Sequence, residues 1–169
     1  LLDKVTDFMI NITRHTKAMI SNDPEWFFDW GALWKGAARI SNCSMHMISP
    51  QFYRDFVFQR DIRFFDAVGG GRVHYCGTAD EVIDDFFKVP HISGLDVEYT
   101  LHDFWQLAQR APKNTVIMPT GAFGEDSPEV KRLLAGDWPK KRNIIIAVNA
   151  SDIESGKSLL KKLRQAMPY

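Results

Sequence analysis

Two residues suited to chemistry lie close together in the stretch VHYCG, at positions 73–77. If this stretch is a β-strand, side chains two positions apart point to the same side, so His74 and Cys76 can reach one metal ion. Zinc binds mixed nitrogen and thiolate ligands, and a catalytic zinc site has three protein ligands and one open position. Two ligands do not complete such a site. A buried strand in which both side chains simply pack therefore stays open as the alternative interpretation.

The elements that must position this pair form a repeating pattern of short apolar runs and amphipathic segments. The runs are SMHMIS, RVHYC, LDVEYT, TVIMPT and NIIIAVNAS, and a segment with helical periodicity follows each one. Alternating strands and helices predict an α/β fold with a parallel sheet. Two architectures fit, an open doubly wound sheet and part of an eight-fold barrel, and both place their sites at the carboxyl ends of strands. The residues predicted at such ends are His74, Cys76, Glu98, Asn149 and Ser151.

The first part of the chain departs from this pattern. Residues 2–20 carry apolar side chains at helical spacing and predict an N-terminal helix. The segment EWFFDWGALWKGAARI, at residues 25–40, predicts a loop or short helix that lies against a pocket. We therefore divide the chain into residues 1–43, an N-terminal helix with an aromatic-rich connecting segment, and residues 44–169, the alternating region of a single domain.

Two glycine-containing motifs are better explained by helix ends than by phosphate binding. The tail ESGKS is similar to a phosphate-binding loop, but that motif needs a glycine where this sequence has Ser151. We expect Ser155 to cap the last helix instead. The run GGGR follows a predicted helix and precedes a strand, the reverse of a dinucleotide-binding fingerprint, so it predicts a helix-ending turn. Ser127 followed by Pro128 predicts a further helix start.

The overall composition excludes several classes of function. Lys and Arg together number 21, as do Asp and Glu, so no net charge recruits nucleic acid or an anionic membrane surface. No apolar run approaches the roughly 20 residues that a membrane-spanning helix needs. The two cysteines do not form a disulfide framework. We therefore expect a cytoplasmic protein with neither a membrane nor a nucleic acid as its partner.

The order of the motifs resembles the C-terminal half of the uroporphyrinogen decarboxylase superfamily. The shared features are an I-S-P-x-x-[FY] helix start, a glycine-ended helix, H-x-C-G on a strand, a G-L-D-V strand and a final strand before a C-terminal helix. The resemblance covers roughly residues 44–169. It implies a partial (β/α)8 TIM barrel with about five βα units, and hence a fragment of a longer chain that lacks the N-terminal strands.

Within that superfamily, H-x-C-G is similar to the motif of the zinc-dependent methyltransferases, which move methyl groups between corrinoid cofactors and thiols. The resemblance implies that His74 and Cys76 are zinc ligands and that a later cysteine is the third. This sequence has Asn149 or Ala150 at the corresponding place. Glu98, at the end of the neighbouring strand, is our candidate for an oxygen ligand. Cys43 is a more remote substitute, because it is predicted to lie before its strand rather than after it.

The resemblance therefore implies an enzyme fragment for zinc-dependent methyl transfer from a corrinoid, bound to a partner protein, to a small-molecule thiol. One alternative is decarboxylation of a tetrapyrrole or related carboxylate, which needs cationic groups over the substrate. Arg72 is not counted among them, because it begins its strand and is predicted to lie at the opposite face of the barrel. The other alternative is a non-catalytic barrel without the third ligand. We also expect the fragment alone to be inactive and to self-associate through its open barrel edge.

Overall fold

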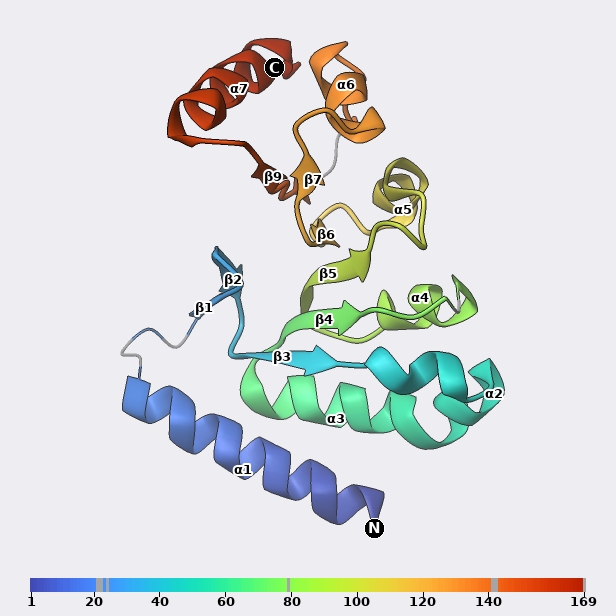
Figure 1. The fold of residues 1–169 in the computed structure, drawn as a ribbon. Coiled ribbons are helices and arrows are strands. Elements are labelled where there is room, and N and C mark those ends of the chain that lie inside the picture. The colour runs from blue at the N-terminus through green and yellow to red at the C-terminus, as the bar shows by residue number, and fades with distance from the viewer. Residues whose placement is uncertain (21–22, 24, 79, 141–142, 169) are drawn as a thin grey trace.

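The computed structural model describes residues 1–20, 23, 25–78, 80–140 and 143–168 (Figure 1). At its centre is a parallel sheet of five strands in the order β3-β4-β5-β6-β8. These strands are β3 (Ala38–Ser41), β4 (Gly71–Tyr75), β5 (Ile92–Glu98), β6 (Val116–Thr120) and β8 (Asn143–Ile144). The predicted α/β fold with a parallel sheet is thereby confirmed.

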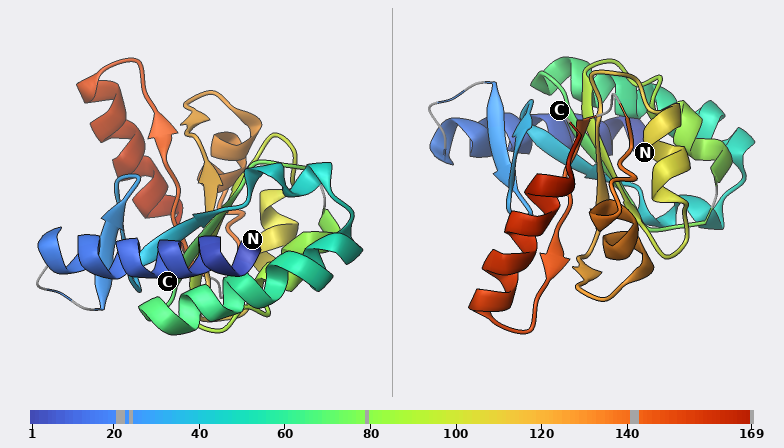
Figure 2. Two further views of the ribbon diagram at one scale, coloured as in Figure 1. Left: turned by 90° about the horizontal axis from the view of Figure 1, so that it is seen from below. Right: turned by 90° about the horizontal axis from the view of Figure 1, so that it is seen from above.

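Helices precede, connect and follow these strands. They are α1 (Leu2–Ile20), α2 (Pro50–Phe52), α3 (Phe58–Val68), α4 (Asp80–Phe86), α5 (Phe104–Arg110), α6 (Pro128–Leu134) and α7 (Ile153–Ala166), with a 3-10 helix η1 (Cys43–Met47) and a π-helical turn η2 (Tyr53–Val57). The predicted N-terminal helix is confirmed as α1, which lies beside α3. Helix α7 lies at the far end of the molecule from α3 (Figures 1 and 2).

The two faces of the sheet differ in chemistry. Successive residues of a strand point to opposite faces, so residues of odd and even number separate. Odd-numbered residues such as Val73, Tyr75 and Leu95 join the apolar core together with side chains of the surrounding helices. Tyr75 meets Phe86 of α4 edge-on, with ring centroids 5.5 Å apart. Arg72, His74 and Asp96 of the same strands are buried polar residues, and they point to the second face.

A β-hairpin rests on the polar face. It consists of β1 (Trp26–Asp29) and β2 (Ala32–Lys35), which pair antiparallel. Trp34 of the hairpin is 1% exposed, and its ring lies over Gly94 of β5, where a Cβ atom would come within 2.2 Å of the indole. The prediction of a loop or short helix for residues 25–40 is therefore wrong. Within the hairpin, the one buried strand residue is Trp34.

The first strand of the sheet lies upstream of its predicted position. The run SMHMIS was expected to be the strand, whereas Ala38–Ser41 pairs with β4 and residues 43–47 form η1. The short helix is closed by local bonds, since the Met45 amide donates to the Asn42 carbonyl at 3.0 Å and a ring nitrogen of His46 lies 2.8 Å from the Cys43 carbonyl. These local bonds outcompete extended pairing for an apolar run that is only six residues long.

The last apolar run is also shorter as a strand than predicted. Of NIIIAVNAS, residues 143–144 form β8 on β6, and β9 (Val148–Asn149) pairs instead with β7 (Phe123–Gly124). The helix that follows is capped by Asp152, whose carboxylate accepts from the Ser155 amide at 2.8 Å. The prediction that Ser155 is the cap is thus wrong.

Other helix ends agree with the sequence. Gly69 ends α3 in the left-handed conformation, with φ 85°, so the predicted helix-ending turn is confirmed. Ser127 caps α6 through the Val130 amide, and Pro128 takes the first helical position as predicted. In the described part of the chain, none of the helices has the length and apolarity that a membrane span requires.

Candidate metal centre

Three possible metal ligands meet beside the carboxyl ends of two neighbouring strands. Cys43 opens η1, two residues after β3 ends; His74 lies within β4, and Cys76 follows β4 directly. One ligand atom from each of these residues lies within 4.8 Å of the others. The structure therefore brings the predicted pair His74 and Cys76 together, and it adds Cys43.

The donor set suits zinc. Zn–S bonds of about 2.3 Å and Zn–N bonds of about 2.0–2.1 Å in a tetrahedron place neighbouring ligand atoms roughly 3.5–3.8 Å apart. The present separations of up to 4.8 Å lie about 1 Å beyond that range, within reach of small side-chain rotations. Two thiols and one imidazole leave one tetrahedral position for a further ligand.

The prediction that Cys43 precedes its strand is wrong. It rested on assigning the strand to SMHMIS, whereas the strand ends at Ser41 and Cys43 follows it. Ser41 is the register partner of His74, and the Asn42 amide donates to the His74 carbonyl at 2.8 Å. This bond fixes residue 42 beside His74, so that Cys43 lies at the same edge of the sheet as Cys76.

The other residues considered from the sequence lie outside this group. The Glu98 carboxylate accepts from the Thr100 hydroxyl at 2.9 Å and from the Thr100 amide at 3.3 Å. Asn149, at the place expected for a third cysteine, is exposed in β9 and pairs with Gly124. Neither side chain is among the three ligands whose donor atoms lie together.

A buried polar network, not predicted from the sequence, lies beneath His74. Asp96 is the register partner of His74 on β5 and is completely buried. Its Oδ2 lies 2.5 Å from Nδ1 of His74 and accepts from the Thr120 hydroxyl at 3.0 Å. An aspartate within an apolar strand was the available signal, because a carboxylate is almost never fully buried unless it is paired.

Arg72 belongs to the same network. It is the second residue of β4, one place later than predicted, and its side chain is completely buried with its guanidinium bound to Asp96. It also donates to Asp29 of the hairpin, at 2.6 Å from Nη2 and 3.1 Å from Nε. Its Cζ lies 4.7 Å from the centre of the Trp34 ring. The arginine is therefore fully engaged by protein groups and does not face a substrate space.

A second buried cluster anchors the segment that carries Cys43. Asp61 of α3 accepts from the Asn42 amide group at 3.0 Å and from the Tyr53 hydroxyl at 2.8 Å. Burial raises the pKa of Asp61 to about 6, and these two hydrogen bonds oppose part of that shift. Burial, together with the nearby Asp61 carboxylate, also raises the pKa of Tyr53. Asn42 thus links Cys43 to the helix layer.

The thiols of Cys43 and Cys76 interact with each other. A hydrogen bond with Cys43, followed by burial, raises the pKa of the Cys76 thiol to about 11. Cys76 is nevertheless exposed, and Cys43 is partly buried. Behind Cys76, a ring nitrogen of His102 lies 2.8 Å from the Gly77 carbonyl, and the other lies 3.1 Å from Asp80. This histidine holds the turn that follows the ligand.

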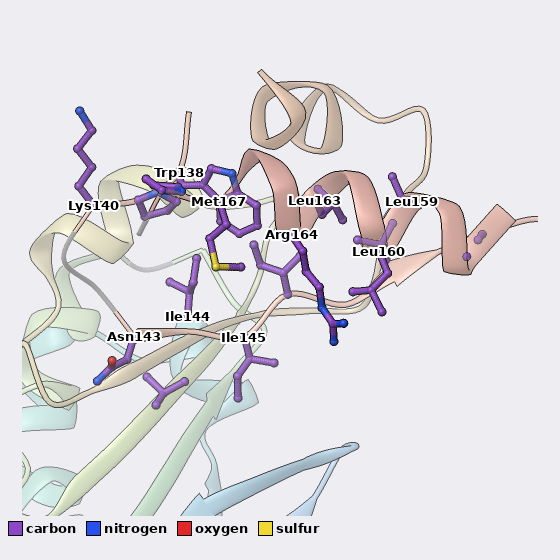
Figure 3. A pocket seen from close by; sticks show the side chains of 17 residues that line it. Trp138, Lys140, Asn143, Ile144, Ile145, Leu159, Leu160, Leu163, Arg164 and Met167 are labelled. Atoms are coloured by element: carbon purple, nitrogen blue, oxygen red, sulfur yellow. The ribbon is translucent and has the colours of Figure 1, made fainter. Parts of the chain in front are cut away.

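A cavity of about 1190 Å³ lies at a different place, between α7 and β8 (Figure 3). Apolar side chains predominate in its lining, among them Trp138, Ile144, Ile145 and Leu163, with Arg164 beside them. None of the three ligand residues lines it. The metal-ligand group and this groove are therefore separate features of the molecule.

Comparison with solved structures finds a methyltransferase from Methanosarcina mazei with a similar fold, at a TM-score of 0.51 and 16% sequence identity. The alignment covers 75% of this chain and 41% of the methyltransferase, so this chain corresponds to less than half of that protein. No model of a known protein family and no curated protein matches the sequence. The fold is thus methyltransferase-like.

Proposed function

We propose that Cys43, His74 and Cys76 bind zinc in a methyltransferase-like enzyme that transfers a methyl group from a corrinoid donor to a thiol. The observation that carries this proposal is the position of Cys43, within 4.8 Å of the other two ligands. Cys43 supplies a third ligand, for which the sequence has no cysteine after the H-x-C-G motif. The fold similarity to a methyltransferase gives further support.

The arrangement suits activation of a thiol. Bound zinc lowers the pKa of a coordinated thiol, so that the thiolate is available to attack a methyl group at neutral pH. The three side chains leave one coordination position for that thiol. Because Cys76 is exposed, the group can be approached from solvent. Cys43 and Cys76 give up their protons when they bind the metal, which removes the hydrogen bond between their thiols.

The sheet supports assignment of the chain to part of a TIM barrel, in which the alternating units begin at β3. Its strand order follows the chain order, whereas a doubly wound sheet reverses its order at a switch point. One face is apolar and covered by helices, and the other carries the buried polar residues Arg72, His74 and Asp96. Such a polar inner face at the carboxyl ends of strands is where barrels place their sites.

The polar face gives less support to decarboxylation. Arg72 is paired with Asp96 and Asp29, and Arg39 also lies 3.7 Å from Asp29. A carboxylated substrate would have to separate these pairs before either cation could bind it. The donor atoms of Cys43, His74 and Cys76 already lie within 4.8 Å of one another, so we favour methyl transfer.

Elemental analysis tests the metal. We expect about one zinc per chain in the wild type and its loss in Cys43→Ala, His74→Ala and Cys76→Ala. Asn149→Ala serves as the matched control and should retain zinc, while Glu98→Gln tests the carboxylate predicted from the sequence. A wild-type chain without zinc, or a Cys43→Ala variant that keeps it, would reject the proposed site.

X-ray absorption then tests the substrate class. On addition of a small thiol, the zinc-loaded protein should gain one sulfur neighbour, from two to three, at about 2.3 Å. An unchanged count would reject thiol activation while leaving the metal site intact. The proposed corrinoid donor is tested separately, by demethylation of methylcobalamin in the presence of the thiol. The full barrel is needed there, because a barrel's site draws on loops from all its units.

The open edges of the sheet support self-association. Strands β3 and β8 each have one paired neighbour in the central sheet, and unpaired edges invite pairing with another chain. The groove beside β8 adds apolar surface there. Analytical ultracentrifugation at micromolar concentration should show a dimer or larger assembly, and a single monomeric species would contradict this.

A further inference from the structure

The orientation of His74 is controlled by groups that do not themselves bind metal. Nδ1 of the imidazole lies 2.5 Å from Oδ2 of Asp96, and the ring packs 5.6 Å from that of Trp30. His74 is 8% exposed, so water has little access to replace either contact. Because a carboxylate oxygen accepts, Nδ1 carries the proton of the neutral imidazole, and Nε2 then keeps its lone pair.

Asp96 has little freedom to move. It is 0% exposed, and Thr120 donates to the same Oδ2 that faces His74. The other oxygen, Oδ1, is bound by Arg72. Both oxygens of this carboxylate are thus bound by neighbours on β4 and β6.

Arg72 is held in turn from the opposite side. Its guanidinium bridges Asp96 and Asp29, and it stacks on Trp34, which lies against Gly94. The cation compensates the buried charge of Asp96, since an unpaired buried carboxylate would be strongly unfavourable. A chain of contacts therefore runs from the hairpin through Arg72 and Asp96 to the histidine.

We propose that Asp96 is a positioning residue for the metal site, holding Nδ1–H of His74 so that Nε2 is the atom presented to a metal with Cys43 and Cys76. The inference rests on the proposed zinc site and specifies how it is built. Outer-shell carboxylates that orient ligating histidines contribute about 10- to 100-fold to metal affinity. Arg72 acts one step further out, by fixing the carboxylate.

Asp96→Asn is the informative substitution. The amide is the same size, but it can turn an N–H group towards the imidazole, which favours the tautomer with the proton on Nε2. That tautomer has no lone pair at the metal-facing nitrogen. The matched control is Asp85→Asn, because Asp85 is also a buried carboxylate but pairs with Arg54 and Lys88 and not with a ligand residue.

Two measurements on the 169-residue chain test the proposal. The zinc dissociation constant, from competition with a chromophoric chelator, should rise about 10- to 100-fold in Asp96→Asn and stay unchanged in Asp85→Asn. Nitrogen-15 NMR of the metal-free wild type at pH 8 should show His74 protonated on Nδ1. His74→Gln identifies its resonances, and Asp96→Asn should move the proton to Nε2.

The outcomes separate this inference from the proposed function. A wild type that binds no zinc rejects the zinc site and, with it, the metal role of Asp96. A wild type that binds zinc with unchanged affinity in Asp96→Asn rejects the role of Asp96 alone. If Asp96→Asn does not fold, the wild-type tautomer decides, because a proton found on Nε2 of His74 overturns the proposal.

Discussion

The carboxyl ends of β3 and β4 differ sharply from the end of the chain's last strand pair. At the first place, three residues that could bind a metal lie within 4.8 Å of one another, and two buried carboxylates, Asp96 and Asp61, support the segments that carry them. At the second, β9 is two residues long, Asn149 is exposed, and an open apolar groove lies alongside. The residue that completes the group, Cys43, thus follows a strand that is next to β4 in the sheet and earlier in the sequence.

The largest expected effect comes from removing the cysteine at position 43 and placing one at position 149 instead. Cys43→Ala should weaken zinc binding by more than the roughly 100-fold that loss of an outer-shell partner can cost. Asn149→Cys, added to Cys43→Ala, should not restore it, because β9 pairs with β7 rather than lying beside β4. Competition with a chelator measures both dissociation constants.

Recovery of wild-type zinc affinity in the double variant would contradict the difference we infer between these two sites. It would mean that the end of β9 reaches the metal, as the resemblance to the methyltransferases implied. Asn149→Ser in the Cys43→Ala background controls for the substitution itself, since serine has nearly the size of cysteine without its soft donor.

The second prediction concerns the carboxylate that supports the Cys43 segment. Burial raises the pKa of Asp61 to about 6, above its ordinary value of 3.8, so the folded protein binds this proton more tightly than the unfolded chain. The free energy of unfolding should therefore rise by about 2 kcal/mol from this residue as pH falls from about 6 to about 4. Urea unfolding across that range measures the change.

Asp61→Asn removes the titrating group and keeps an oxygen for Asn42 and Tyr53. The difference in unfolding free energy between wild type and variant should be flat above pH 7 and should change between pH 6 and 4. A constant difference over the whole range would show that Asp61 is not held in the buried, hydrogen-bonded state. Asp103→Asn, at an exposed helix cap, is the control substitution outside the buried cluster.

The sequence predicted the fold class well because periodicity and helix caps are local signals. The helix before Gly69, the cap at Ser127 and the strand that carries His74 are each encoded within a few residues. The strand at Ala38–Ser41 was missed because its apolar content is small and its pairing with β4 is long-range. That single error concealed the role of Cys43.

The supporting network was missed for a related reason. Asp96 meets His74 only through strand register, and Arg72 meets Asp29 only once the hairpin folds back onto the sheet. A single sequence contains no signal for register between segments more than twenty residues apart. The sequence shows Arg72 in β4 and Asp96 in β5, but it does not indicate that these two residues pair with each other.

The smallest expected effects compare two glycines, Gly94 of β5 beneath the hairpin and Gly124 of β7. In Gly94→Ala the new methyl group would lie 2.2 Å from the Trp34 ring, which is backed by Arg72, so overpacking should cost about 1–3 kcal/mol of unfolding free energy. Gly124→Ala meets no atom within 4 Å and should change stability by no more than about 0.5 kcal/mol. Thermal and urea unfolding measure both. Equal effects would mean that the hairpin does not press on the sheet, and the contacts that hold Arg72, Asp96 and His74 would then lack their outer support.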